Sequence, residues 1–90
     1  MQFEWNPKKS AANFRKHGVS FDEAATVFKD DLSLTGDDPE HSLIEERFVT
    51  FGVSGAGRLL VVSYTERGDR IRIISARPAT RSERKMYEEG

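Results

Sequence analysis

Cysteine is absent from the 90 residues of this chain, which excludes a disulfide framework and any metal site built on thiolates. Stability must therefore come from a packed core, and a cysteine-free chain fits a reducing, cytoplasmic compartment. Long apolar runs are missing too. No stretch approaches the roughly 20 residues of a membrane span, and the N-terminus has no signal-peptide pattern. A chain of this length predicts a single domain over residues 1–90.

An excess of one charge is also absent, because the formal net charge is only −1. The charges are nevertheless unevenly distributed. Residues 30–46 carry seven acidic and no Lys or Arg side chains, whereas residues 67–85 carry seven basic side chains, six of them arginine. The planar guanidinium of arginine suits both phosphate and carboxylate. The two segments could neutralise each other in salt bridges, or the arginines could form a basic face for a nucleic acid, and both interpretations stay open.

Capping signals predict two helices near the N-terminus. Asn6 is a good N-cap and Pro7 suits the first helical position, so a helix is expected over residues 7–16, ended by Gly18 in a left-handed conformation. The apolar face of this helix is thin and consists of Ala11, Ala12 and Phe14.

A second helix is expected over residues 21–29. Ser20 and Glu23 have the spacing of a capping box, and the apolar residues that follow recur at helical spacing. Those apolar residues are Phe21, Ala24, Ala25 and Phe28.

The rest of the chain has the pattern of short strands and tight turns. Strands are expected over residues 1–5, 32–35, 45–53, 58–66 and 70–77. The turns "SGAG" and "RGD" make the last three of these antiparallel. Thr80 and Glu83 then form a capping box that opens a short final helix, ending at about residue 88. The pattern predicts an α+β fold, in which an antiparallel β-sheet packs against the two N-terminal helices and a short C-terminal helix follows.

Four separated blocks of the sequence resemble one protein family. They are "FEWNPKKSAANFRKHGVSFDEAATVF", "DPEHSLIEERF", "GRLLVVSYTERGDRIRIISARPAT" and "ERKMYEE", in this order. Together they span almost the whole chain and resemble the BrnT family. The family pattern has an aspartate where this chain has Asn6, and both side chains can cap a helix.

The resemblance implies a RelE-like domain that is the toxin of a bacterial type II toxin–antitoxin system, a component of stress responses. Such a toxin is an endoribonuclease that cleaves RNA and inhibits translation. It also implies a partner, a BrnA-type antitoxin encoded nearby that binds DNA and forms a hetero-oligomer with the toxin. The resemblance implies no cofactor.

Metal-free cleavage of RNA needs a base for the 2′-hydroxyl, cations for the charged phosphorane and an acid for the leaving oxygen. We expect catalytic roles for Arg77, Arg67 and Arg47, with Glu46 as a candidate base. Arg77 is preferred because it closes a strand with apolar inner residues, and RelE-like toxins resemble this in placing an arginine on the last strand. Each of these side chains could instead be held by a carboxylate of the same chain.

Two further catalytic candidates are His17 and Tyr87. His17 could act as a general base when neutral, or could simply stabilise the C-terminus of its helix. Tyr87 could stack on an RNA base or assist proton transfer, or could dock the last helix. RNA-binding candidates are Lys16, Arg58, Arg70 and Arg81, and His41 is a weaker candidate for a functional role.

Hairpin geometry sorts the arginines into two groups. Arg67 is expected opposite Arg70, with Arg47 near the same end of the sheet. Arg58 and Arg77 approach the other end. The nuclease hypothesis requires guanidinium groups from separate strands to converge on a single phosphodiester.

Two alternatives differ from a metal-free nuclease. The loop carboxylates Asp37, Asp38 and Glu40 lack zinc-ligand spacing; a magnesium site there is a disfavoured alternative, and no metal is expected. The second alternative is a non-catalytic module that binds an antitoxin-like, DNA-binding partner through an edge strand or a basic face.

Overall fold

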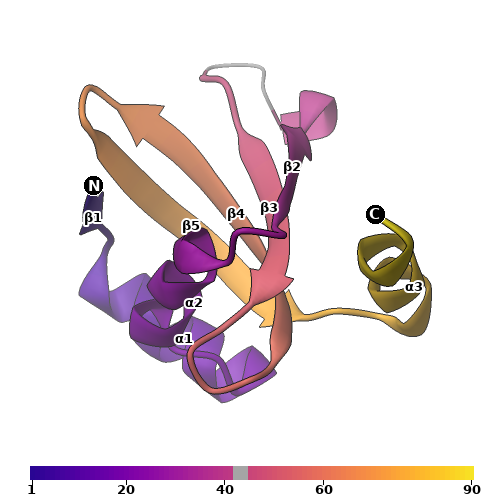
Figure 1. Ribbon diagram of the computed structural model, residues 1–90. Helices are drawn as coiled ribbons and strands as arrows, with labels where there is room; N and C mark the ends of the chain where they lie inside the picture. The colour runs from indigo at the N-terminus through magenta and orange to yellow at the C-terminus, as the bar shows by residue number, and fades with distance from the viewer. Residues whose placement is uncertain (42–44) are drawn as a thin grey trace.

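The computed structural model describes residues 1–41 and 45–90 of this mixed α+β protein (Figure 1). In chain order the elements are β1 (Gln2–Glu4), α1 (Pro7–His17), α2 (Phe21–Thr26), the 3₁₀ turn η1 (Val27–Lys29), β2 (Leu34–Asp37), the 3₁₀ turn η2 (Pro39–His41), β3 (Phe48–Val53), β4 (Leu59–Arg67), β5 (Arg70–Pro78) and α3 (Arg81–Glu89). Each expected helix and strand is present close to its expected bounds. The resemblance block "DPEHSLIEERF" lies partly outside the described residues. No helix within the described ranges is long and apolar enough to cross a membrane.

The ends of α1 follow the sequence prediction, but its buried face does not. The Asn6 side chain accepts hydrogen bonds from the backbone N–H groups of Lys8 and Lys9, and Gly18 ends the helix at φ 71°. The expected apolar face is wrong, because Ala11, Ala12 and Phe14 are all exposed. The buried residue is Asn13, whose side-chain amide bonds both backbone groups of Ala76 on β5. A polar side chain therefore attaches α1 to the sheet.

The second predicted helix is divided into α2 and the turn η1. Ser20 caps α2 by accepting a hydrogen bond from the backbone N–H of Glu23 at 3.1 Å. The Glu23 carboxylate instead binds the guanidinium of Arg58 and the hydroxyl of Ser54. A charged guanidinium is a stronger partner for a carboxylate than a backbone N–H group, which explains why this side chain reaches the sheet.

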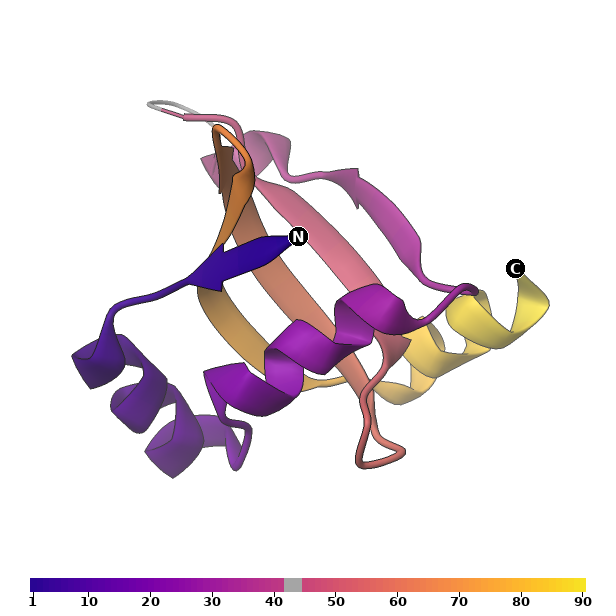
Figure 2. The same cartoon turned by 60° about the vertical axis from the view of Figure 1, so that its left-hand side comes forward.

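The five strands form one sheet in the order β1-β5-β4-β3-β2. The expectation of an antiparallel sheet is wrong at one edge, where β1 pairs with β5 in parallel. The other neighbours are antiparallel. Strand β1 precedes the two helices in the chain and pairs with the edge of the sheet that β5 would otherwise form (Figure 2).

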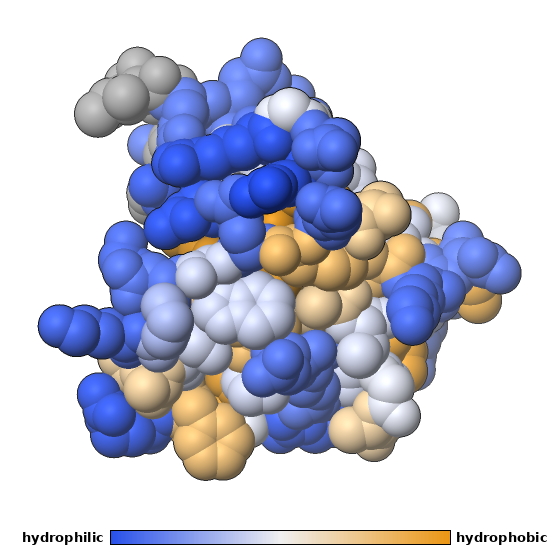
Figure 3. Space-filling view, turned by 90° about the vertical axis from the view of Figure 1, so that its left-hand side faces the viewer, coloured by the Kyte–Doolittle hydropathy of each residue, from blue (hydrophilic) through white to orange (hydrophobic). Residues whose placement is uncertain are grey.

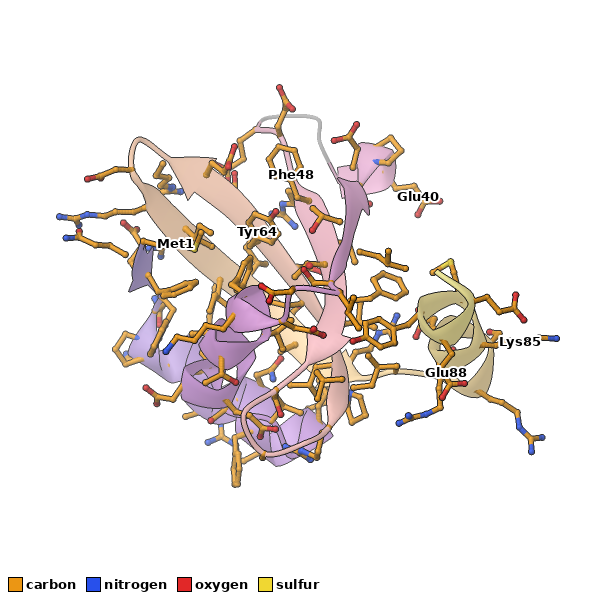
Figure 4. The ribbon with its side chains drawn as sticks, in the orientation of Figure 1. Met1, Glu40, Phe48, Tyr64, Lys85 and Glu88 are labelled. Carbon is orange, nitrogen blue, oxygen red and sulfur yellow. The ribbon has the colours of Figure 1, made fainter. Side chains whose placement is uncertain are left out.

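The two faces of the sheet have different surroundings. Helices α1 and α2 lie on one side, while α3 stands apart from them (Figures 1 and 2). The core between helices and sheet consists of Val19, Phe21, Ala24, Val27, Leu60, Val62, Tyr64, Ile71, Ile73 and Ala76. Phe48 and Tyr64 stack on adjacent strands at 5.5 Å between ring centroids (Figure 4). No residue of α3 is buried.

A β-bulge in β5 decides which of its side chains share a face. Ser63 pairs with Ser75, but the next residue, Tyr64, pairs with Ile73, so Ile74 is an extra residue without a partner of its own. An extra residue shifts the in–out alternation of a strand by one position.

The bulge places even-numbered and odd-numbered arginines of β5 on the same face. Ile71, Ile73 and Ala76 all belong to the core on the helix side. Arg70 and Arg72 before the bulge and Arg77 after it therefore lie on the opposite face, which we call the open face.

Candidate active site

A pocket of about 360 Å³ lies on the open face. Its lining residues come from β2, β3, β4, β5 and α3, and from the residue that follows β2. They are Asp37, Asp38, Val49, Phe51, Val61, Ser63, Ser75, Arg77 and Glu83. The pocket therefore combines an apolar floor with two hydroxyls, three carboxylates and one guanidinium.

Arg77 is held in this pocket by Glu83, the first-turn acid of α3. Its Nη1 and Nη2 donate to the two carboxylate oxygens of Glu83 at 2.7 and 2.8 Å. The predicted capping box is confirmed, since Thr80 and Glu83 exchange both of its hydrogen bonds. The hydrogen bonds from Arg77 and Thr80 lower the pKa of Glu83 to about 2, and the carboxylate raises the pKa of Arg77.

These pKa values restrict what the pair can do. A carboxyl with a pKa of about 2 is a weak base at neutral pH, so Glu83 is poorly suited to remove a proton. It instead fixes the plane of the guanidinium. Because 40% of the Arg77 side chain is exposed, a phosphate that enters the pocket can reach it, in competition with Glu83.

The acidic residues of the pocket are a separate feature. Asp37 ends β2 and is exposed, and the backbone N–H of Asp38 donates to the carbonyl of Arg47 at 2.9 Å. Three carboxylates and one guanidinium make the pocket net negative, which opposes phosphate binding except next to Arg77. In the described part of the chain, no three acidic or histidine side chains are grouped as a metal site.

Tyr87 lies outside the pocket and docks α3. Its hydroxyl donates to Asp30 at 2.6 Å, and the same carboxylate accepts the backbone N–H groups of Leu32 and Val53. These hydrogen bonds lower the pKa of Asp30, and the bond to the carboxylate raises the pKa of Tyr87. Tyr87 and Glu83 are four residues apart, so they lie on the same side of α3.

Arg58, Lys16 and His17 gather around the corner between α1 and α2. The Nε of Arg58 donates to Glu23 at 2.9 Å, and an Nη donates to the carbonyl of Gly18. Lys16 and His17 are the last residues of α1. Arg58 approaches the same end of the sheet as Arg77, as predicted, but its side chain points to the helix face and Arg77 to the open face.

A second group of cations lies at the turn between β4 and β5. We call it the hairpin arginine cluster, and it consists of Arg67, Arg70 and Arg72 (Figure 3 shows this side of the molecule). Arg72 donates to Glu4 at 2.7 Å. Arg70 lies 3.7 Å from Glu4, and Arg67 lies 3.6 Å from Glu45.

The expectation that arginines of separate strands converge on one phosphate is wrong. Arg67 pairs with Arg70 at the turn as predicted, but Arg77 lies seven residues further along β5, roughly 20 Å away at the rise of a strand. Arg47 and Glu46 lie just before β3, where the carbonyl of Glu46 accepts the Thr65 hydroxyl at 2.6 Å. Arg81 is exposed at the start of α3.

Sequence reasoning missed five polar pocket residues as catalytic or RNA-binding residues. They are Asp37 and Asp38, which were considered only for a magnesium site, and Ser63, Ser75 and Glu83. Ser63 could have been found, because it interrupts the apolar run of β4 on the face opposite Tyr64. Ser75 could not, because strict alternation without the bulge places it on the helix face. Glu83 was recognised as a cap, but its role as the partner of Arg77 depends on where α3 docks.

Comparison with known proteins identifies the protein family of this chain. Residues 5–83 match the family described as "Ribonuclease toxin, BrnT, of type II toxin-antitoxin system". The chain therefore belongs to the BrnT family and is a ribonuclease toxin of a type II toxin–antitoxin system, whose partner is an antitoxin. No curated protein sequence matches the chain.

Among solved structures, the chain is similar to the ribonuclease toxin BrnT of Brucella abortus, known from a crystal structure at 1.1 Å resolution. The two share 26% sequence identity with a TM-score of 0.67. The match covers 90% of this chain and 99% of the Brucella chain. The similarity therefore extends over nearly the whole length of both chains.

Proposed function

We propose that this toxin cleaves RNA on the open face, with Arg77 bound to the scissile phosphate and without a metal ion. The pocket supports this site, because it combines a fixed guanidinium, two hydroxyl groups and three carboxylates in about 360 Å³, within the size range of small-ligand sites. The proposal includes a RelE-like fold for the single domain 1–90 and inhibition of translation as the consequence of RNA cleavage.

In the proposed reaction, the 2′-oxygen of the RNA attacks the adjacent phosphorus and the bond to the 5′-oxygen breaks, which leaves a 2′,3′-cyclic phosphate. Asp37 accepts the proton of the 2′-hydroxyl, and the leaving oxygen takes a proton from water. The hydroxide that remains takes the proton from Asp37, which restores the carboxylate. The guanidinium of Arg77 stabilises the negative charge that the phosphorane gains. This single arginine takes the place of the converging arginines that the sequence-based hypothesis required, because Arg77 is the one arginine that lines the described pocket. Glu83 is a positioning residue that orients this guanidinium.

The other predicted residues do not line this pocket in the part of the chain that the structure describes. Catalytic roles for Arg67, Arg47, Glu46, His17 and Tyr87 stay predictions. So do RNA contacts of Lys16, Arg58, Arg70 and Arg81.

The test combines expression in cells with cleavage by purified protein. The chain is induced without an antitoxin, while growth and RNA integrity are followed, and the purified protein is incubated with RNA in EDTA. We expect cleavage that survives EDTA and yields 2′,3′-cyclic phosphate ends. Arg77→Ala should lower the cleavage rate at least about 100-fold, whereas Arg84→Ala, an exposed arginine of α3, should not.

Glu83 loses its partner in Arg77→Ala, so this variant needs two controls for loss of folding. They are the variant Arg77→Lys and a thermal melt. Loss of cleavage in EDTA would contradict the metal-free reaction. Intact RNA and normal growth with soluble, folded protein would favour the alternative of a non-catalytic binding module.

We further propose that the antitoxin is a BrnA-type, DNA-binding protein encoded nearby and that toxin and antitoxin form a hetero-oligomer in the cytoplasm. The β2 edge of the sheet supports an interaction of this kind, because an edge strand presents unpaired backbone groups. Co-purification with the product of an adjacent reading frame tests this. A chain that stays alone when both proteins are produced together would contradict it.

A further inference from the structure

The hairpin arginine cluster lies on the same face as the proposed cleavage pocket. Without the bulge at Ile74, residues 70 and 72 would face opposite to residue 77. With it, Arg70 and Arg72 lie on the same face of β5 as Arg77, and Arg67 lies opposite Arg70 at the end of β4. Between the cluster and Arg77 lie Ser75 and its cross-strand partner Ser63, whose hydroxyls also line the pocket.

The ion pairs of this cluster are of two kinds. Arg72 is hydrogen-bonded to Glu4, and 29% of its side chain is exposed. Arg67 and Arg70 are 50% and 56% exposed, and they lie 3.6 and 3.7 Å from their carboxylates. Exposed ion pairs of this length contribute about 0–1 kcal/mol to the free energy of folding. A phosphate can therefore replace Glu45 or Glu4 as their partner at little cost.

The spacing of the cluster agrees with a nucleic-acid backbone. Its three guanidinium groups share the carboxylates of Glu4 and Glu45, and Asp69 lies in the same turn, so the cluster offers phosphate exposed guanidinium donors and not an excess of positive charge. Arg70 and Arg77 are seven residues apart, which is roughly 20 Å along a strand. A stacked nucleic-acid strand has a phosphate about every 3.4 Å along its axis, so the two arginines are about six nucleotides apart, and fewer in an extended strand.

We propose that the hairpin arginine cluster binds the backbone of single-stranded RNA, about six nucleotides or fewer from the phosphate at Arg77. This inference rests on the proposed function of the pocket and adds the substrate class. The strand must be unpaired, because a nucleotide has to enter the pocket while its neighbours follow β5, and a duplex does not splay out a single nucleotide without cost. Arg67 and Arg70 then bind RNA, and Arg72 with Glu4 positions them.

The test measures RNA binding separately from cleavage. Arg67→Gln/Arg70→Gln is compared with wild type and with Arg15→Gln/Arg84→Gln, which removes two exposed arginines elsewhere. The probes are fluorescent 2′-O-methyl RNA oligonucleotides of about three and about twelve nucleotides, which cannot be cleaved. Their affinities are measured by anisotropy at several salt concentrations.

We expect the cluster variant to bind the long oligonucleotide about tenfold more weakly at low salt and the short one unchanged. Its salt dependence should also be less steep, by about 0.7 in slope for each lost phosphate contact. The control variant should match wild type. A thermal melt, with Arg70→Gln alone as a second variant, establishes that the fold is retained.

Two results would overturn the inference: unchanged affinity for the long oligonucleotide, or equal losses for both lengths. Unchanged RNA affinity with weaker antitoxin binding would show that the cluster faces a protein instead. A wild-type chain that binds the long oligonucleotide through the cluster but cleaves no RNA would overturn the proposed function and leave this inference in place.

Discussion

Glu83→Gln separates the charge of the Arg77–Glu83 pair from the capping of α3. Glutamine retains the hydrogen bonds of a capping box but has no charge. The pKa of Glu83 is about 2, against an ordinary value of 4.5, which corresponds to at most about 3 kcal/mol of folding free energy at neutral pH. Because 40% of the Arg77 side chain is exposed, solvent screening reduces the expected loss to about 1–2 kcal/mol.

The stability lost in Glu83→Gln should become smaller as the pH falls. Folding lowers the pKa of Glu83, so its stabilisation is complete above about pH 5 and disappears as the pH falls towards about 2. Urea unfolding of wild type, Glu83→Gln and Glu88→Gln would measure this between pH 7 and pH 2 (approximate limits). Glu88 is an exposed acid of the same helix. The reasoning would be refuted if Glu83→Gln lowered the free energy of unfolding equally at both ends of this pH range. It would also be refuted if the two substitutions had equal effects.

Two further substitutions test the packing by chemical denaturation. Gly52→Ala should cost about 1–3 kcal/mol, because a Cβ there would lie 2.8 Å from a methyl carbon of η1; Gly36→Ala, with nothing within 4 Å, is the matched control. Asn13→Ala should cost about 2–4 kcal/mol, because the buried backbone groups of Ala76 lose their partner. Its cost should exceed that of Asn6→Ala, which removes an exposed cap worth about 1 kcal/mol; the reverse order would contradict the buried role.

Local signals predicted local structure well. The N-cap at Asn6, the left-handed Gly18 and the capping box of Thr80 with Glu83 each depend on residues within one turn, and all three are confirmed. The tight turn also predicted that Arg67 opposes Arg70. Continued from that turn without a bulge, the same register predicts that Leu60 lies near Arg77. It fails there by one residue, because Val61 pairs with Arg77. The bulge is the reason, since an extra residue in one strand shifts every later pair.

The site was less predictable than the fold. Arg77 was chosen as the preferred catalytic residue, which stays a prediction, and it lines the pocket. Its partner was not predicted, because Glu83 reaches it only after α3 docks. Arg58 was expected near Arg77 and is on the other face, where Glu23 holds it. The turns near a residue in the sequence define which end of the sheet it occupies. The face of the sheet to which its side chain points depends on every bulge between that turn and the residue.

By itself, the sequence determined the order of helices and strands, the positions of the caps and turns, and the family to which the chain belongs. These features follow from interactions between residues close in the chain, or from residue patterns that survive without coordinates. Only the tertiary structure decided the parallel pairing of β1, the burial of Asn13 and the common face of Arg72 and Arg77. Each of these depends on contacts between segments about 60 residues apart or on one extra residue in a strand, and neither leaves a periodic signal in the sequence.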